Sequence, residues 1–212
     1  MKYTHILWDW NGTLLDDVEI SIDCVNVLLS QLGLEPTDKQ EYHKMMDMPM
    51  KKYYENLFLS RNFPFEYEKC TENFQKNYPT LINKATLSSN ALEILDFFKN
   101  SGAKQYIVSS FEKNRLREYV RLFKIEHYFE EISGDDDIHV GSKSARAIEL
   151  VKDVDRENIV YIGDSEADFI TAKDVGCDCI LFSGGHQPQK KLKTFGCKVI
   201  DNLIELKNLD IF

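Results

Sequence analysis

The sequence predicts an α/β fold in which a doubly wound, Rossmann-like parallel sheet carries an inserted small α-helical cap domain. Three observations support this fold. Short apolar runs typical of buried strands recur along the 212 residues, helical periodicity separates most of them, and one long interval contains only helical patterns. The predicted strands cover residues 6–8, 106–108, 128–132, 159–162, 179–182 and 198–200.

The long helical interval runs from Asp16 to about Lys84. Its first helix is predicted from apolar residues at three- and four-residue spacing, with Asp16 or Asp17 capping its start and Gly33 ending it. These apolar residues are Val18, Ile22, Val25, Leu29 and Leu32.

Three further helices are predicted in the same interval. Thr37 and Gln40 have the spacing of a capping box, in which two side chains satisfy free N–H groups at a helix start. Helical patterns then cover residues 51–59 and 65–78, and the second of them is expected to stop before Pro79.

This pattern divides the chain into two predicted domains, a core of residues 1–15 and 86–212 and a cap of residues 16–85. Ligands of parallel α/β sheets bind at the carboxyl ends of the strands. A helical insertion that follows the first strand is therefore placed to close over the ligand as a lid. The alternative is a helical bundle that only pads the fold.

Composition and charge limit the classes of function. The formal net charge of −9 argues against general nucleic-acid binding, although a metal ion and a few lysines would still permit an anionic substrate. The chain has no basic leader followed by an apolar run and no apolar stretch of membrane-spanning length. We expect a cytoplasmic protein that binds neither nucleic acid nor membrane. The oligomeric state stays open.

The five cysteines predict neither a disulfide framework nor a metal site. Their number is odd, and no two of them form a Cys-x-x-Cys pair. Cys177 and Cys179 are expected on one side of a strand, as buried reduced thiols. The full set is Cys24, Cys70, Cys177, Cys179 and Cys197.

The first candidate motif is Asp-Trp-Asn-Gly-Thr at residues 9–13, directly after an apolar strand. A strand end would hold the Asp9 carboxylate still, as a nucleophile requires. Gly12 would let the backbone turn sharply and approach a ligand. The Thr13 hydroxyl and the nearby N–H groups would contact an anion.

Two further motifs offer groups that bind anions. Ser109 and Ser110 follow the predicted strand at 106–108, so their hydroxyls can donate to an anion at the same edge of the sheet. The Gly-Ser-Lys-Ser motif at 141–144 precedes a helical stretch and places Lys143 in its first turn. An ammonium group at a helix start makes a favourable anion site.

The fourth motif supplies carboxylates. Asp164 follows the strand at 159–162, and Asp168 lies one helical turn later. Carboxylates gathered near Asp9 would repel one another unless a cation lay among them. Hard oxygen ligands next to an anionic substrate suggest Mg²⁺.

Together, these four motifs resemble those of the haloacid dehalogenase superfamily, in the phosphatase branch with a small helical cap. The chain looks most similar to phosphoglycolate-phosphatase-like and β-phosphoglucomutase-like proteins. The motifs occur in the family's order from residue 9 to residue 168, with the cap between the first and the second. The resemblance covers essentially the whole chain and implies a small phosphorylated metabolite as substrate.

The resemblance also implies roles for the site residues. Asp9 would attack phosphorus and form an aspartyl-phosphate that water hydrolyses. Mg²⁺ would be held by Asp9, the backbone carbonyl of Asn11 and Asp164, with Asp168 supporting it directly or through water. The phosphoryl oxygens would be held by Ser109, Ser110 and Lys143, in a pocket shaped by Gly12 and Thr13.

The chain departs from the family at Asn11, where related phosphatases usually carry an aspartate that protonates the leaving group and activates water. An amide exchanges no proton at useful pH, and such catalysis is typically worth about 10²–10⁴-fold. Three interpretations stay open: a phosphatase that tolerates Asn11, a phosphate-binding or regulatory protein with little turnover, and a phosphonate hydrolase. The third would use a cap lysine, Lys51 or Lys52, to form a Schiff base, as family phosphonatases do. A dehalogenase is disfavoured because Asp164 would have no clear purpose.

Two smaller features complete the set of candidates. Asp135, Asp136 and Asp137 are interpreted as a solvated acidic loop and not as a metal cluster. Gly184-Gly185-His186 follows the last well-defined core strand, near the rim of the site. His186 could contact the substrate there, but we favour a plain loop.

Overall fold

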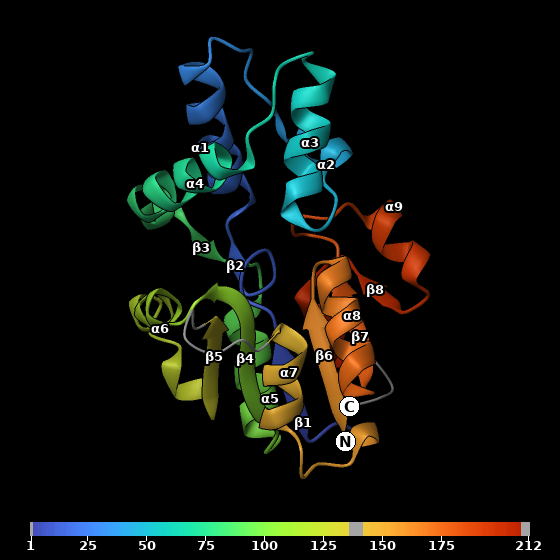
Figure 1. The fold of residues 1–212 in the computed structure, drawn as a ribbon. Helices are drawn as coiled ribbons and strands as arrows, with labels where there is room; N and C mark the ends of the chain where they lie inside the picture. The colour runs from blue at the N-terminus through green and yellow to red at the C-terminus, as the bar shows by residue number, and fades with distance from the viewer. Residues whose placement is uncertain (1, 136–141, 209–212) are drawn as a thin grey trace.

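The structure is a computed structural model, which describes residues 2–135 and 142–208. Its core is a six-stranded parallel sheet with the strand order β5-β4-β1-β6-β7-β8 (Figure 1). Strands β4 and β6 flank β1, so the carboxyl ends of these three strands lie side by side. The strands are β1 His5–Trp8, β4 Lys104–Glu112, β5 Glu131–Asp135, β6 Ile159–Gly163, β7 Asp178–Phe182 and β8 Lys198–Ile200.

Helices cover both faces of this sheet, as the alternating pattern predicts. Successive side chains of a strand point to opposite faces. Ile6 and Trp8 therefore pack in the apolar cluster beneath α5 and α6, whereas Leu7 belongs to the cluster beneath α7 and α8. The helices are α5 Ala91–Asn100, α6 Lys113–Leu122, α7 Lys143–Leu150 and α8 Glu166–Val175.

Short helical segments lie between these main elements and the insertion. They are α9 Gln189–Leu192, η1 Ile82–Lys84, η2 Glu126–Tyr128, η3 Arg156–Asn158, η4 Lys193–Phe195 and η5 Leu203–Asn208, where η marks a 3₁₀ helix. Within residues 2–135 and 142–208, no helix combines the length and the apolar character needed to cross a membrane.

The predicted strand at 128–132 is misplaced. Tyr128 ends the 3₁₀ helix η2, and β5 begins only at Glu131. The Tyr128 hydroxyl donates to the Asp96 carboxylate on α5 at 2.7 Å. Tyr128 therefore contacts helix α5 and does not extend the sheet. Strand β4 is longer than predicted and continues past Ser109 to Glu112.

Four helices form the insertion above the carboxyl edge of the sheet (Figure 1). Twelve buried residues from these helices and their connections form an apolar cluster separate from the two clusters of the core. A short antiparallel pair, β2 Leu15–Asp16 with β3 Thr86–Leu87, links insertion and sheet, and we retain 16–85 as the proposed cap. The helices are α1 Val18–Gln31, α2 Lys39–Met45, α3 Met50–Ser60 and α4 Tyr67–Leu81.

Three details of the cap differ from the prediction. Asp17 precedes α1 but makes no side-chain cap bond, because its carboxylate faces the cavity described below. Helix α2 is capped by Asp38, which accepts from the Glu41 amide at 2.8 Å, and not by Thr37. Helix α4 continues through Pro79 to Leu81, since its packing against α1 outweighs the backbone bond that the proline removes.

All five cysteines are free, as predicted, but only Cys24 and Cys70 are buried. Cys177, Cys179 and Cys197 are half-buried. Cys177 lies just before β7 and not within it, because the strand begins at Asp178.

Candidate active site

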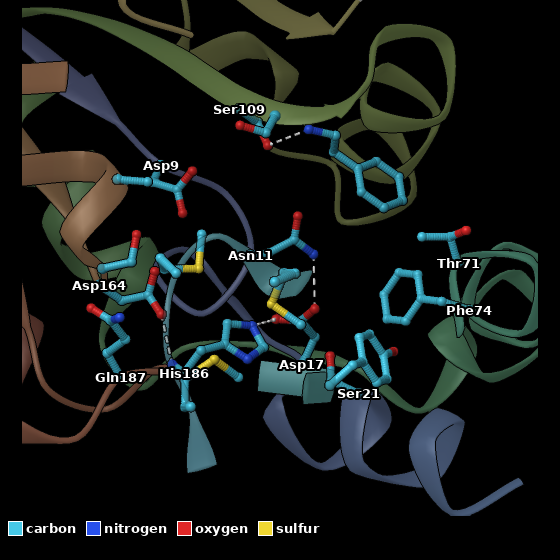
Figure 2. Close-up of a pocket in the computed structure, with 18 of the residues that line it drawn as sticks. Asp9, Asn11, Asp17, Ser21, Thr71, Phe74, Ser109, Asp164, His186 and Gln187 are labelled. Atoms are coloured by element: carbon cyan, nitrogen blue, oxygen red, sulfur yellow. Dashed lines mark hydrogen bonds and ion pairs between the residues drawn. The ribbon is translucent and has the colours of Figure 1, made fainter. Parts of the chain in front are cut away.

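The cavity lies where the carboxyl ends of β1, β4 and β6 meet the cap. It has a volume of about 330 Å³. Asp9 follows β1, Ser109 lies in β4 and Asp164 follows β6, and all three line the cavity. Figure 2 shows them on one side, with residues of the cap opposite. Ser110 and Lys143 also line it.

Three buried carboxylates form the centre of the site. Oxygens of Asp9, Asp164 and Asp168 lie within 4.8 Å of one another. Lys143 donates to Asp9 at 2.5 Å and to Asp168 at 2.6 Å, so one ammonium serves two carboxylates. The cluster thus keeps an excess of negative charge, and a set of hard carboxylate oxygens of this kind fits a divalent cation such as Mg²⁺.

The pKa values of the clustered side chains reflect this excess of negative charge. Burial, and then the charge of Asp168, raise the pKa of Asp9 to about 8 despite the nearby Lys143. Burial also raises the pKa of Asp164 to about 6. Burial by itself lowers the pKa of Lys143, but the charges of Asp168 and Asp9 outweigh it and hold that pKa well above its ordinary value.

Asp168 organises the loop after β6. Its Oδ2 accepts from the backbone N–H groups of Asp164 and Ser165 at 3.1 and 3.0 Å and from the Ser165 hydroxyl at 2.6 Å. Its other oxygen accepts from Lys143. Because both of its oxygens accept hydrogen bonds, Asp168 holds Lys143 and the backbone of Asp164 and Ser165 in position.

The turn after Asp9 is tight. Gly12 has a φ of +72°, and a Cβ at this position would overlap the Asp164 carboxylate. Its N–H donates to the Leu15 carbonyl and to Asp17. Thr13 is fully buried, with its hydroxyl 3.5 Å from Asp164. Both residues therefore lie behind the described lining of the cavity and shape the loop from there.

Asn11 lines the cavity and is held by a network that the sequence did not indicate. Its Nδ2 donates to Asp17 (Figure 2) and to the Tyr78 hydroxyl, both at 2.8 Å. The Tyr78 hydroxyl donates to the same Asp17 oxygen at 2.7 Å. The amide of Asn11 is thus fixed from the side of the cap.

His186 is the second unexpected member of this network. Its Nε2 lies 3.2 Å from Asp17, its Nδ1 lies 2.9 Å from the Tyr42 hydroxyl, and its backbone N–H donates to Asp164 at 2.6 Å. Burial by itself lowers the pKa of His186, but the charge of Asp17 outweighs it and raises the pKa to about 9. The expectation of a plain loop at His186 was wrong, because this side chain is an ion-paired part of the cavity.

Gln187 is a further residue that the sequence did not reveal. It is fully buried and lines the cavity, and its Oε1 accepts from the Glu166 amide at 2.7 Å. Its Nε2 has no hydrogen-bond partner among the described residues. In the sequence, the Gly184-Gly185 pair was the one local indication of a loop at this position.

Other sequence candidates lie elsewhere. Lys51 and Lys52 are exposed on α3 and are not among the described residues that line the cavity. Asp135 ends β5 and pairs with Arg146 at 3.0 Å. Asp136, Asp137 and Gly141 lie outside the described residues.

Sequence comparison decides the family. A family model described as haloacid dehalogenase-like hydrolase matches residues 6–182. The chain belongs to the haloacid dehalogenase-like hydrolases. It is 22% identical over 202 residues to a phosphoglycolate phosphatase of Caulobacter vibrioides, which covers 92% of this chain and 85% of the relative. It is 26% identical over 189 residues to a phosphoglycolate phosphatase of Aquifex aeolicus, with 85% of each chain covered.

Solved structures share the fold. A haloacid dehalogenase-like protein of Agrobacterium tumefaciens matches with a TM-score of 0.82 at 18% identity, over 98% of this chain and 97% of that one. The protein tyrosine kinase A of Mycobacterium tuberculosis matches with a TM-score of 0.78 at 18% identity, over the same shares of the two chains. The predicted doubly wound fold with a helical insertion is thereby confirmed.

Proposed function

We propose that this chain is a Mg²⁺-dependent phosphatase that hydrolyses a small phosphate monoester through an aspartyl-phosphate on Asp9. The observation that carries the proposal is the position of the Asp9 carboxylate, which lies at the end of β1 in the acidic cluster and 2.5 Å from Lys143. The relatives named phosphoglycolate phosphatase support the same reaction class.

In the proposed reaction, a carboxylate oxygen of Asp9 attacks phosphorus in line, and the bond between phosphorus and the ester oxygen breaks. The ester oxygen takes up a proton from solvent water and leaves as the alcohol. A water molecule then attacks the phosphorus of the aspartyl-phosphate, which releases phosphate and restores Asp9. Lys143, Ser109 and Ser110 would hold the phosphoryl oxygens, because all three line the cavity beside Asp9.

The carboxylate cluster would hold Mg²⁺ through Asp9, Asp164 and the backbone carbonyl of Asn11, with Asp168 in support. Bound Mg²⁺ would supply positive charge against the transferring phosphoryl group and the excess negative charge of the cluster. Gly12 and Thr13 would keep the loop close enough to Asp164 for these groups to converge.

Asn11 favours one other candidate, a phosphate-binding or regulatory protein with little turnover. Its side-chain nitrogen is committed to Asp17 and Tyr78, and an amide carries no proton to the leaving group. The missing acid–base step corresponds to about 10²–10⁴-fold in rate. The phosphonate-hydrolase interpretation gains no such support, because Lys51 and Lys52 are exposed.

Phosphate release from a panel of small esters and acetyl phosphate, with Mg²⁺ or with a chelator, tests the proposal. We expect Mg²⁺-dependent release, fastest for acetyl phosphate, whose leaving group needs no proton. Binding of phosphate with Mg²⁺ but no release from any ester would support the binding protein instead.

A further inference from the structure

The wall that the cap contributes to the cavity is largely apolar. It consists largely of methionine and aromatic side chains of the cap, and Phe111 adds another ring from the core. Figure 2 shows Phe74 on this wall, across the cavity from Asp9. The cap residues are Met46, Met48, Met50, Tyr54, Tyr67 and Phe74.

The cap also contributes polar groups to the cavity, of which the Asp17 carboxylate is negatively charged. Ser21, Thr71 and Gln75 add two hydroxyls and an amide. Among the described residues that line the cavity, the cationic side chains are Lys143 and His186.

Both of these cations already have anionic partners. Lys143 lies between Asp9 and Asp168. His186 contacts Asp17, whose buried carboxylate adds a further negative charge beside the cavity. A second anionic group on the substrate would therefore lose its hydration without meeting a free cation among the described lining residues, which is unfavourable.

We propose that the substrate's leaving group is a neutral, largely apolar alcohol and not an acid such as glycolate or a second phosphate. An apolar group gains free energy when it leaves water for this wall. Methionine side chains adapt to its shape, and the aromatic rings stack against a flat one. This assignment rests on the proposed phosphatase function. It predicts a substrate other than phosphoglycolate, after which the two phosphatase relatives are named.

The test compares primary-alcohol esters that differ only in the leaving group: ethyl phosphate, 2-phenylethyl phosphate, 2-phosphoglycolate and 3-phosphooxypropanoate. We expect kcat/KM for 2-phenylethyl phosphate to exceed that of ethyl phosphate and of both carboxylate esters by about tenfold or more. Equal or higher kcat/KM for a carboxylate ester would overturn the inference while leaving the phosphatase function intact.

Cap variants give an independent readout. Thr71→Lys adds an ammonium group to the wall and should shift the ratio of kcat/KM toward the carboxylate esters by about tenfold, whereas the uncharged control Thr71→Met should not. Phe74→Leu should reduce the preference for the phenyl ester. An unchanged ratio in both Thr71→Lys and Phe74→Leu would contradict the assignment.

Failure of the phosphatase function is recognised separately. If wild type releases phosphate from no ester, calorimetric binding of the same four esters to wild type with Mg²⁺ still measures the preference. Tighter binding of 2-phenylethyl phosphate would support the neutral leaving group, and tighter binding of a carboxylate ester would refute it.

Discussion

The residue that sets the character of this site is Asn11. The amide makes a hydrogen bond to Asp17 that a carboxylate at position 11 would lose. An aspartate would also bring two like charges within about 3 Å, which raises the free energy of the folded state. The substitution at position 11 and the carboxylate at position 17 therefore belong together.

This coupling predicts the behaviour of a residue swap. Asn11→Asp should lower the melting temperature, and Asn11→Asp with Asp17→Asn should recover part of the loss, because an amide again faces a carboxylate. We also expect the double variant to release phosphate faster than wild type, by up to about 10²-fold. Thermal melts and ester hydrolysis measure both effects. A double variant no more stable than Asn11→Asp would show that the two positions are not coupled.

The buried ion pairs of Lys143 give a second prediction, about stability. Lys143→Met leaves Asp9 and Asp168 buried without their ammonium partner and should cost about 3 kcal/mol of unfolding free energy in the absence of Mg²⁺. The matched control is Lys152→Met, because Lys152 pairs with Glu149 at 2.7 Å on the exposed surface, and the loss of this pair should cost far less. Urea denaturation distinguishes the two. Equal losses would mean that the buried ion pairs do not stabilise the fold.

Among the elements, the cap helices depend on an ion pair that joins the start of α2 to the end of α3. Arg61 donates to both oxygens of Glu41, at 3.1 and 2.9 Å, and the Thr37 hydroxyl donates to one of them. The Arg61 hydrogen bond, followed by that of Thr37, outweighs burial and lowers the pKa of Glu41 below its ordinary value of 4.5.

A lowered carboxyl pKa gives a defined dependence on pH. The pair stabilises the fold fully above pH 4.5, and this contribution is lost as the pH falls through the lower pKa of the folded state. Glu41→Gln should therefore cost about 1 kcal/mol at pH 7 and progressively less as the pH falls below 4.5. Denaturation of wild type and variant between pH 3 and pH 7 measures the difference. A difference that grows toward low pH would contradict this sign.

At the scale of the whole molecule, the sequence predicted the architecture better than the site. Buried strands such as β6 are continuous apolar runs, so the sheet was evident, and the motifs at its carboxyl edge placed Asp9 and Asp164 correctly at strand ends. Asp17 was interpreted as a helix cap because aspartate before a helix is typical of one. His186 lies 169 positions from Asp17, and no local pattern indicates that the two side chains meet.

The excess of buried negative charge predicts that the folded protein gains stability from Mg²⁺. A ligand that binds only the folded state stabilises it by about 2.7 kcal/mol at a hundredfold excess over its dissociation constant. We expect Mg²⁺ to raise the melting temperature at constant ionic strength, and Asp164→Asn to remove most of the shift. A shift of equal size in Asp164→Asn would place the cation elsewhere.

The role of Asp9 is tested by Mg²⁺-dependent phosphate release from wild type, Asp9→Asn and the control Asp153→Asn, whose carboxylate is exposed and is not among the described residues that line the cavity. We expect Asp9→Asn to lose at least about 10³-fold in kcat and Asp153→Asn to keep the wild-type rate. Wild-type turnover that persists in Asp9→Asn would contradict Asp9 as the nucleophile.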